Sequence, residues 1–281
     1  MPLAPRPATS QKPWWQTARV VAFLIVLHAL PVVGVLAGST PADWWTFAVT
    51  HLTLAFFVAS GLHRYFAHQS FRTSRLGQLI LAVGGCMAFT DPIGFAGKHR
   101  IHHRYSDTEG DPHSPNEGWF SCWIWSLADD HLTDAQVKAA CPDLMRHAEL
   151  RWLHRWYWLP GSLLAAGYLA WGGLPRLGIG FALALVLALH LTSAVNYACH
   201  RWGSRRFDTA EGSRNNAVVA LLTWGEGWHN NHHRYPAAAR AGFRWWEIDV
   251  NYYVIRLLSL LGLVWDVHEV PARLRDTGTA R

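Results

Sequence analysis

Hydrophobic residues are concentrated in four long runs rather than spread evenly along the chain. None of the runs contains Asp, Glu, Lys or Arg, and each is about long enough to cross a hydrocarbon core of about 30 Å as a helix. The runs are 20–38, 44–62, 158–174 and 177–199. They predict an all-α integral membrane protein with four transmembrane helices in two hairpins. Buried core helices of a soluble protein are the alternative, and four runs of this length disfavour it.

The basic residues predict the orientation of these helices. Of the 25 Lys and Arg residues, all but Arg176 lie before, between or after the two hairpins. Such an excess marks the cytoplasmic side of a membrane, so both termini and the long polar segments are expected in the cytoplasm. The net charge of +6 then reflects topology and attraction to anionic headgroups, and no basic patch on a recognisable fold indicates nucleic-acid binding. Three Lys against 22 Arg weakly favour a GC-rich bacterial source and therefore a bacterial cytoplasmic membrane.

The remaining segments define the domain limits. Residues 1–18 are proline-rich and predicted to be disordered, residues 19–269 form the membrane domain, and residues 270–281 form a C-terminal tail. Residues 74–90 are apolar but interrupted by Gly84 and Gly85. We expect an interfacial helix here, because a fifth span would separate the polar segments on either side of it.

Histidines gather just outside the predicted spans, all on the predicted cytoplasmic side. The chain has 17, and nine of them occur in short motifs: HRYFAH, HRIHH, NYACH and HNNHH. These motifs contain His63, His68, His99, His102, His103, His200, His229, His232 and His233, with Asn196 preceding His200 by four residues.

The spacing of these residues favours metal binding. Positions i, i+3 and i+4 share one face of a helix, so each HxxHH motif presents its imidazoles to one side. His63 and His68 are five apart, about 140° around a regular helix. They converge only if the helix ends or bends between them, or else they serve different centres. Nine histidines exceed the four ligands of one zinc ion, so two ions are expected, and imidazole suits zinc, copper, iron or nickel.

The ordered set of motifs resembles the membrane-bound fatty-acid desaturases, specifically the Δ9 acyl-CoA desaturase-like proteins of bacteria and plants. The resemblance rests on HRYFAH (63–68), HRIHH (99–103), DTEGDPH (107–113), NYACHRWG (196–203), GEGWHNNHHRYP (225–236) and the segment 244–267. It implies a cytoplasmic helical cap that holds a di-iron centre on the nine histidines, with Asn196 approaching one iron through a water. It further implies O2 as co-substrate and a cis double bond as product, most simply at the 9,10 position.

The resemblance also sets expectations for partners and supporting residues. A histidine-only ligand set needs carboxylates to orient its rings, and the candidates are Glu226, Asp107, Glu109 and Asp111. The substrate is an acyl thioester or an acyl lipid. The carrier is open because Gly97–Lys98 stands where animal members have an Arg-Asp pair. Electrons must come from a separate donor, such as a ferredoxin, a cytochrome b5-like protein or a reductase, and an arginine-rich face at Arg201, Arg205 and Arg206 is a candidate docking site.

The other histidines are assigned no metal. His113 lies in a turn-rich segment, and His131, His147, His154 and His268 are expected at the surface or at interfaces. His28, His51 and His190 fall inside spans, where helix–helix hydrogen bonding is expected.

Two alternatives to a desaturase stay open on the sequence: a related di-iron hydroxylase or acetylenase, and a metal-binding membrane transporter or sensor. A transporter would place ionisable groups near the middle of the bilayer, whereas these motifs lie beyond the helix ends.

Overall fold

The computed structural model describes residues 14–128 and 131–276, and they are mostly helical. The longer helices are α1 (Trp14–Leu36), α2 (Pro41–Phe56) continued by the π-helix η1 (Phe57–Ala67), α3 (Arg75–Met87), α4 (Pro92–Tyr105), α8 (Trp158–Pro175), and the π-helix η5 (Arg176–Leu183) continued by α9 (Ala184–Arg201). The shorter elements are β1 (Arg72–Thr73), η2 (Pro115–Glu117), η3 (Ser121–Trp125), α5 (Ser126–Ala128), α6 (Asp134–Ala139), η4 (Leu144–Arg146), α7 (Ala148–Arg155), α10 (Ala217–Leu222), α11 (His229–Arg234), α12 (Val250–Leu260), β2 (Val264–Trp265) and α13 (Ala272–Asp276).

Three of the described helices are long and apolar enough to cross a membrane: Trp14–Leu36, Pro41–Ala67 and Trp158–Arg201. The third has 44 residues, about 66 Å of helix, or twice a hydrocarbon core. It is interrupted at Gly172 and Gly173, where Gly173 has a φ of +67°. Beyond that break the chain packs back on itself, and the rings of Tyr168 and Phe181 lie 5.9 Å apart. The four predicted runs therefore fall within these three helices, except that Ala37 and Gly38 of the first run follow the end of α1.

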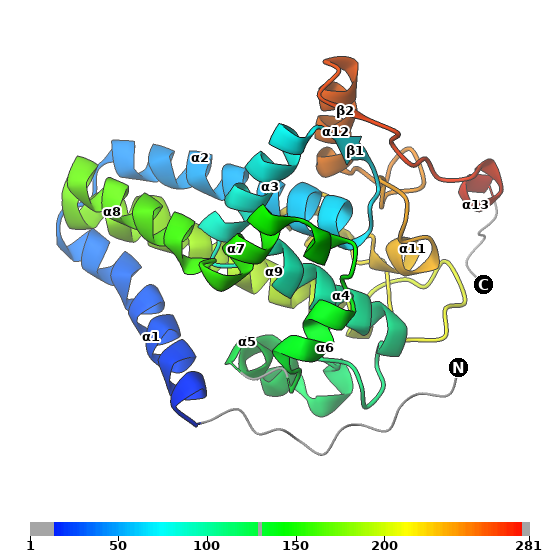
Figure 1. Cartoon of the computed structure of the whole chain (residues 1–281), viewed down its shortest axis with the longest axis horizontal. Helices are drawn as coiled ribbons and strands as arrows, with labels where there is room; N and C mark the ends of the chain where they lie inside the picture. The colour runs from blue at the N-terminus through cyan, green and yellow to red at the C-terminus, as the bar shows by residue number, and fades with distance from the viewer. Residues whose placement is uncertain (1–13, 129–130, 277–281) are drawn as a thin grey trace.

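The first helix packs against η5 through small residues. A Cβ atom added at Gly34 would lie 3.0 Å from the Cα of Gly178, and one added at Gly178 would collide with the backbone oxygen of Leu30. Close approach of two backbones through small residues is typical of helix packing in lipid. In Figure 1, α1, α2 and α8 occupy the left of the molecule and α11 and α13 the right, with α4 and α9 between them and α12 at the top.

The predicted interfacial segment 74–90 contains one helix, α3. The Ser74 hydroxyl accepts a hydrogen bond from the Gly77 N–H at 3.0 Å and begins the helix, and the carboxylate of Asp91 likewise accepts from Gly94 N–H at 2.8 Å to begin α4. The two helices are bent by 82°, and by length and composition the pair could also make one broken span. Placement of α3 on the membrane surface stays a prediction.

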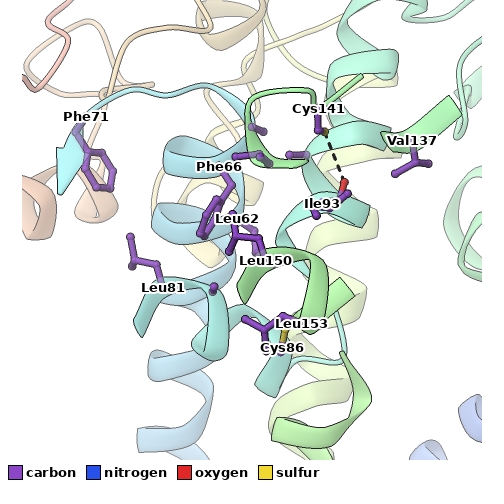
Figure 2. Packing of buried hydrophobic residues seen from close by; sticks show 14 of the residues in the cluster. Leu62, Phe66, Phe71, Leu81, Cys86, Ile93, Val137, Cys141, Leu150 and Leu153 are labelled. Atoms are coloured by element: carbon purple, nitrogen blue, oxygen red, sulfur yellow. Dashed lines mark hydrogen bonds between the residues drawn. The ribbon is translucent and has the colours of Figure 1, made fainter. Parts of the chain in front are cut away.

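The largest group of buried hydrophobic residues surrounds η1 (Figure 2). Leu62 and Phe66 of η1 are fully buried among Ile93 of α4 and Leu150 of α7. Ile255 of α12 joins the same core. Because η1 continues α2, this core joins α4, α7 and α12 to the end of a candidate span.

Both ends of the chain differ from the sequence-based limits. Helix α1 begins at Trp14, so residues 14–18 of the predicted disordered lead are helical, and residues 1–13 lie outside the described part. The segment predicted as a tail contains α13, and Val270 and Leu274 are buried against Phe207 and Phe243. The packed part of the chain therefore extends beyond residue 269, the predicted limit of the domain.

Candidate metal centre

The first histidine motif converges through a change of helix type. The N–H of His68 donates to the carbonyl oxygen of His63 at 3.2 Å, which is the i→i+5 bond of a π-helix. The wider turn brings residues five apart onto nearly the same face, and the two rings lie 4.9 Å apart. Helix η1 ends at Ala67, directly before His68, and the two histidines belong to the same group. An end of the helix between them was one of the sequence-based alternatives, whereas the π-helical turn that accompanies it was not.

The two HxxHH motifs each divide between two groups of imidazoles, which corrects the expectation that each motif forms one compact group. On α4, the Nε2 atoms of His99 and His103 are 3.0 Å apart, while His102 turns toward α9. On α11, the Nε2 atoms of His229 and His233 are likewise 3.0 Å apart. His99 and His103 therefore share one group with His232 of the other motif. His229 and His233 share the second group with His102.

The nine predicted histidines therefore form two groups. Within each group, the candidate ligand atoms all lie within 4.8 Å of one another. The first histidine group consists of His63, His68, His99, His103 and His232, and the second histidine group consists of His102, His200, His229 and His233. The groups are adjacent, since the rings of His103 and His233 stack with centroids 4.3 Å apart.

The spacing of the nitrogens is informative about the ion they would fit. Neighbouring Nε2 atoms are 2.8 Å apart for His68 and His99, 3.0 Å for His63 and His232, and 3.1 Å for His200 and His229. Two nitrogens each about 2.1 Å from a shared ion are about 3.0 Å apart at a 90° angle and about 3.4 Å apart at the tetrahedral angle. The separations thus favour a site with more than four ligands.

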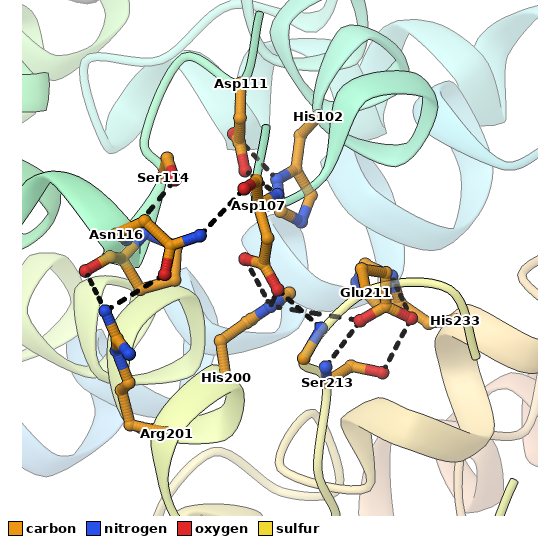
Figure 3. A network of polar contacts seen from close by, with 12 residues as sticks. His102, Asp107, Asp111, Ser114, Asn116, His200, Arg201, Glu211, Ser213 and His233 are labelled. Atoms are coloured by element: carbon orange, nitrogen blue, oxygen red, sulfur yellow. Dashed lines mark hydrogen bonds and ion pairs between the residues drawn. The ribbon is translucent and has the colours of Figure 1, made fainter. Parts of the chain in front are cut away.

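Carboxylates contact the opposite ring nitrogens, and Figure 3 shows this for His102 and His200. Nδ1 of His63 lies 2.5 Å from Glu226, Nδ1 of His102 lies 2.9 Å from Asp111, and Nδ1 of His200 lies 3.0 Å from Asp107. Each carboxylate accepts a hydrogen bond from Nδ1–H. The lone pair of the same ring's Nε2 is then directed into the group. Carboxylate support of this kind is the usual outer layer of a histidine metal site.

The three imidazoles of α11 are held in the neutral form. Burial, reinforced by the neighbouring imidazoles, lowers the pKa of His229, His232 and His233 well below the ordinary histidine range. Neutral imidazole is the form that binds a metal. Several lone pairs that face one another are mutually repulsive, and a cation between them would remove that repulsion. Nε2 of His102 is buried and has no hydrogen-bond partner within residues 14–128 and 131–276.

Glu226 connects the first histidine group to a buried arginine. Arg64 donates to Glu226 at 2.5 Å and to Asp249 at 2.9 Å, and all three side chains are nearly inaccessible to solvent. Burial opposes ionisation of Glu226, but the charge of Arg64 and the contact with His63 outweigh it and lower its pKa to about 2. The carboxylate is therefore charged when it faces His63.

A fourth carboxylate, that of Glu211, was missed by the sequence analysis. It lies 3.5 Å from Nδ1 of His233 and 4.0 Å from Nδ1 of His200. Its loop is fastened by the buried side chain of Asn230, whose Oδ1 accepts from the backbone N–H of Phe207 at 2.7 Å. Glu211 is separated from every histidine motif by many residues and has no helical spacing to one, so no sequence signal identified it.

The remaining candidates are placed less centrally. Asn196 lies one helical turn before His200 on α9 and is half-buried, and among the described residues its side chain makes no hydrogen bond. Glu109 is an exposed residue of the loop after α4, whereas the other three predicted carboxylates face imidazoles. His113 packs its ring 4.3 Å from that of His102, and its Nδ1 lies 3.6 Å from Asp111, so it is closer to the site than its turn-rich sequence indicated.

Two of the histidines inside the long helices form the expected interhelical contact. The indole N–H of Trp123 donates to Nδ1 of His190 at 2.9 Å, and Nε2 of His190 lies 3.0 Å from Nε2 of His28. Nδ1 of His51 is buried without a hydrogen-bond partner among the described residues, but the ring also bonds the backbone of Ala184 on α9, so the expected interhelical contact is present there too. His154 lies outside the spans and bonds Asp91 at 2.8 Å. His131 and His268 are exposed, and His147 is half-buried beside Arg75.

Comparison with known proteins agrees with this arrangement. The model of the fatty acid desaturase family matches residues 42–257. The chain is 37% identical over 265 residues to an acyl-CoA C20 Delta5-desaturase of Anemone leveillei, across 92% of this chain and 85% of that protein. It is 38% identical over 255 residues to an icosanoyl-CoA 5-desaturase of Limnanthes douglasii, across 87% of this chain and 70% of that protein. It is 35% identical over 234 residues to Delta-9 acyl-lipid desaturase 1 of Arabidopsis thaliana, across 79% of this chain and 76% of that protein. The chain belongs to the fatty acid desaturase family.

Proposed function

We propose that this protein is a membrane-embedded acyl desaturase that uses O2 and a pair of irons held by the two histidine groups. The observation that carries the proposal is the convergence of nine Nε2-bearing rings into two adjacent groups, three of whose members have carboxylates on Nδ1. Family membership supports an oxidoreductase and gives no support to the transporter or sensor alternative.

The donor set fits iron better than a structural zinc. The first histidine group offers five nitrogens and the second offers four, with Asn196 nearby on α9 to hold a water. Nitrogens about 3.0 Å apart suit a site with more than four ligands, whereas structural zinc is usually tetrahedral. We assign the first iron to the first histidine group and the second iron to the second group with Asn196 through a water.

When bound, the irons and O2 supply the oxidising power for removal of two hydrogens from adjacent methylene groups. Overall, one CH2–CH2 unit, O2, two electrons and two protons give a cis CH=CH unit and two waters. The residues of the chain have three tasks in this reaction. The carboxylates hold the Nδ1 protons and thereby fix the imidazole rings, burial of the two groups excludes water, and the apolar helix ends surround the acyl chain.

The substrate is proposed as a long saturated acyl thioester that is desaturated at the 9,10 position. Two relatives are named Delta-9 acyl-lipid desaturases, and others are named for Delta5 and Delta7 positions, so the family alone leaves the position open. Gly97 of the Gly97–Lys98 pair packs against Val137 on α6, where an added Cβ would lie 2.5 Å from the Val137 carbonyl oxygen. A large side chain therefore has no room at this position, and recognition of the carrier differs from that of the animal members.

Electrons are proposed to come from a separate acidic donor that docks on the basic face of the cap. The structure narrows the predicted docking residues. The side chain of Arg206 is only 5% exposed and donates to the carbonyl oxygens of Leu274 and Arg275, so it holds α13 in place. Arg201 and Arg205 are exposed and keep the proposed role. Charge reversal at these two residues is expected to slow turnover with a natural donor and to leave turnover with a small chemical reductant unchanged.

The proposed topology has four crossings, with Trp158–Arg201 contributing two because its length is twice that of one span. Both termini and the histidine groups then lie in the cytoplasm. The bacterial cytoplasmic membrane remains the proposed location on the grounds of composition, although two of the plant relatives are named as chloroplastic.

The test is the fatty-acid profile of a desaturase-deficient host that expresses the chain, measured by gas chromatography–mass spectrometry with location of the double bond. A new monounsaturated acid is expected with the unaltered chain and with His147→Ala, and none with His229→Ala. A hydroxylated or acetylenic product would instead assign the related di-iron reactions. An active His229→Ala variant would refute the assignment of the second group.

A further inference from the structure

Helix α12 has one buried face and an exposed apolar face opposite to it. Ile255 and Asn251 are buried, with 0% and 1% of their surfaces exposed. On the far side, Tyr253, Leu257 and Leu260 are 44%, 55% and 80% exposed. At about 100° per residue the three exposed residues fall within about 60° of one another and roughly opposite Ile255. The outward face of the helix is therefore apolar.

The polar residues of α12 lie on its flank. The Tyr252 hydroxyl donates to Glu269 at 3.0 Å, and Arg256 forms an ion pair with the same carboxylate at 3.1 Å. A surface helix in water normally turns its polar face away from the core. Here the residues opposite the core are Leu and Tyr, so this face is suited to an apolar surrounding.

The apolar surface continues from α12 onto α3. The turn after α12 enters β2, which pairs antiparallel with β1 through Thr73 and Val264, and the Thr73 hydroxyl donates to the Leu263 carbonyl oxygen at 2.8 Å. Helix α3 begins two residues beyond β1. The combined surface is called the apolar foot below, and its residues are 37–80% exposed. It consists of Leu76, Leu79, Ile80, Tyr253, Leu257, Leu260, Leu261, Leu263 and Trp265.

The position of the foot favours lipid over water or another protein. The inner face of α3 packs on η1, where Gly84 adjoins the ring of Phe57, and the residues after α3 adjoin α8, where Gly161 adjoins Phe89. Both α8 and η1 belong to candidate membrane helices. The α3 part of the foot thus adjoins two candidate membrane helices, and α12 lies crosswise to α2 in Figure 1.

The border of the foot has the chemistry of a membrane interface. Arg72 and Arg75 lie at the α3 end of the foot, with side chains that are 75% and 65% exposed, and they pair with Asp266 and Glu149. Guanidinium groups there would meet lipid phosphates. Trp265 and Tyr253 are the aromatic members of the foot, and these residue types are enriched at the level of the headgroups. An apolar face with basic and aromatic edges is typical of a helix that lies in the interface plane.

We propose that the apolar foot inserts into the boundary between headgroups and acyl chains, so that α12 and α3 together seat the cap in the bilayer surface. Asp249, which begins α12 by accepting from Tyr252 N–H at 3.0 Å, also bonds Arg64 at 2.9 Å. Arg64 directly follows His63 in η1. Insertion of α12 therefore sets the depth of the first histidine group relative to the acyl chains.

The test uses environment-sensitive fluorophores on single introduced cysteines in the full-length protein. All four native cysteines are buried, so Leu257→Cys and Leu260→Cys can be labelled selectively. Ala135→Cys on α6, exposed beside the Asp134–Lys138 ion pair, is the matched control. In vesicles of phosphatidylcholine and phosphatidylglycerol, we expect a nitroxide near the headgroup end of the acyl chain to quench the labels at 257 and 260 and aqueous iodide to quench only the label at 135.

Two outcomes would overturn the proposal. Equal iodide quenching at 257 and 135 would place α12 in water. Protection from both quenchers, with disulfide formation between two copies of Leu257→Cys, would assign the foot to a second copy of the chain. As a further check, Leu257→Glu with Leu260→Glu is expected to abolish lipid quenching of a label at Leu263→Cys, whereas Ser259→Glu on the polar flank is expected to preserve it.

Discussion

Replacement of Glu226 by glutamine tests the link between the outer carboxylates and metal binding. The carboxylate accepts from Nδ1 of His63 at 2.5 Å and from Arg64 at 2.5 Å. Glutamine keeps the shape but removes the charge, so the imidazole loses the partner that orients it. Loss of such a partner weakens metal affinity about 10- to 100-fold, which corresponds to about 1.4–2.7 kcal/mol.

The same substitution also lowers the stability of the fold. Removal of one partner from a buried ion pair costs about 3–5 kcal/mol. Because Arg64 retains Asp249, we expect the lower end of that range. Asp249→Asn is the informative comparison, since Asp249 contacts Arg64 but makes no contact with His63 among the described residues. It should reduce the free energy of unfolding while leaving iron affinity close to that of the unaltered protein.

The assay is competition for Fe2+ with a chromophoric chelator under anaerobic conditions, together with thermal unfolding in detergent. Glu269→Gln serves as the control, because the Arg256–Glu269 pair is about half exposed and is worth about 0–1 kcal/mol. Unchanged iron affinity in Glu226→Gln would refute the role assigned to this carboxylate. A loss of affinity of equal size in Asp249→Asn would attribute the effect to general loosening of the cap.

Three further predictions follow from the same geometry. Glu211→Gln should weaken iron binding by the second histidine group, seen as a fall in iron per chain, because Glu211 supports His233. Removal of iron by a chelator should lower the unfolding temperature and its return should restore it, since a ligand that binds only the folded state stabilises that state. The hydrogen bond to Asp91 raises the pKa of His154, so its contribution of about 1 kcal/mol is present below the unfolded pKa and is lost as pH rises through the folded pKa. His154→Gln should abolish that pH dependence of unfolding.

Much of the site was predictable because histidines have few structural uses at such density. The identity of all nine members of the two groups follows from the motifs, and three of the four carboxylates that face them, those of Asp107, Asp111 and Glu226, lie close to the motifs in sequence. The hydrophobic runs likewise predicted the long helices, because apolar length alone determines which segments suit a bilayer.

The missing parts depend on helix geometry and tertiary contacts. A regular helix places His63 and His68 apart, and only the observed π-helix brings them together. The division of each HxxHH motif requires two facing helices whose relative rotation the sequence does not encode locally. Glu211 reaches His233 because Asn230 fastens its loop, which is a contact between distant segments.

The most direct test of the central claim is the iron-edge anomalous scattering of crystals loaded with Fe2+. Two peaks are expected, one enclosed by the five rings of the first histidine group and one by the four rings of the second histidine group. His102 and His232 are expected to lie on the opposite centre from the other histidines of their own motifs. A single peak, or two peaks with each HxxHH motif confined to one of them, would contradict the assignment of two metal sites to these groups.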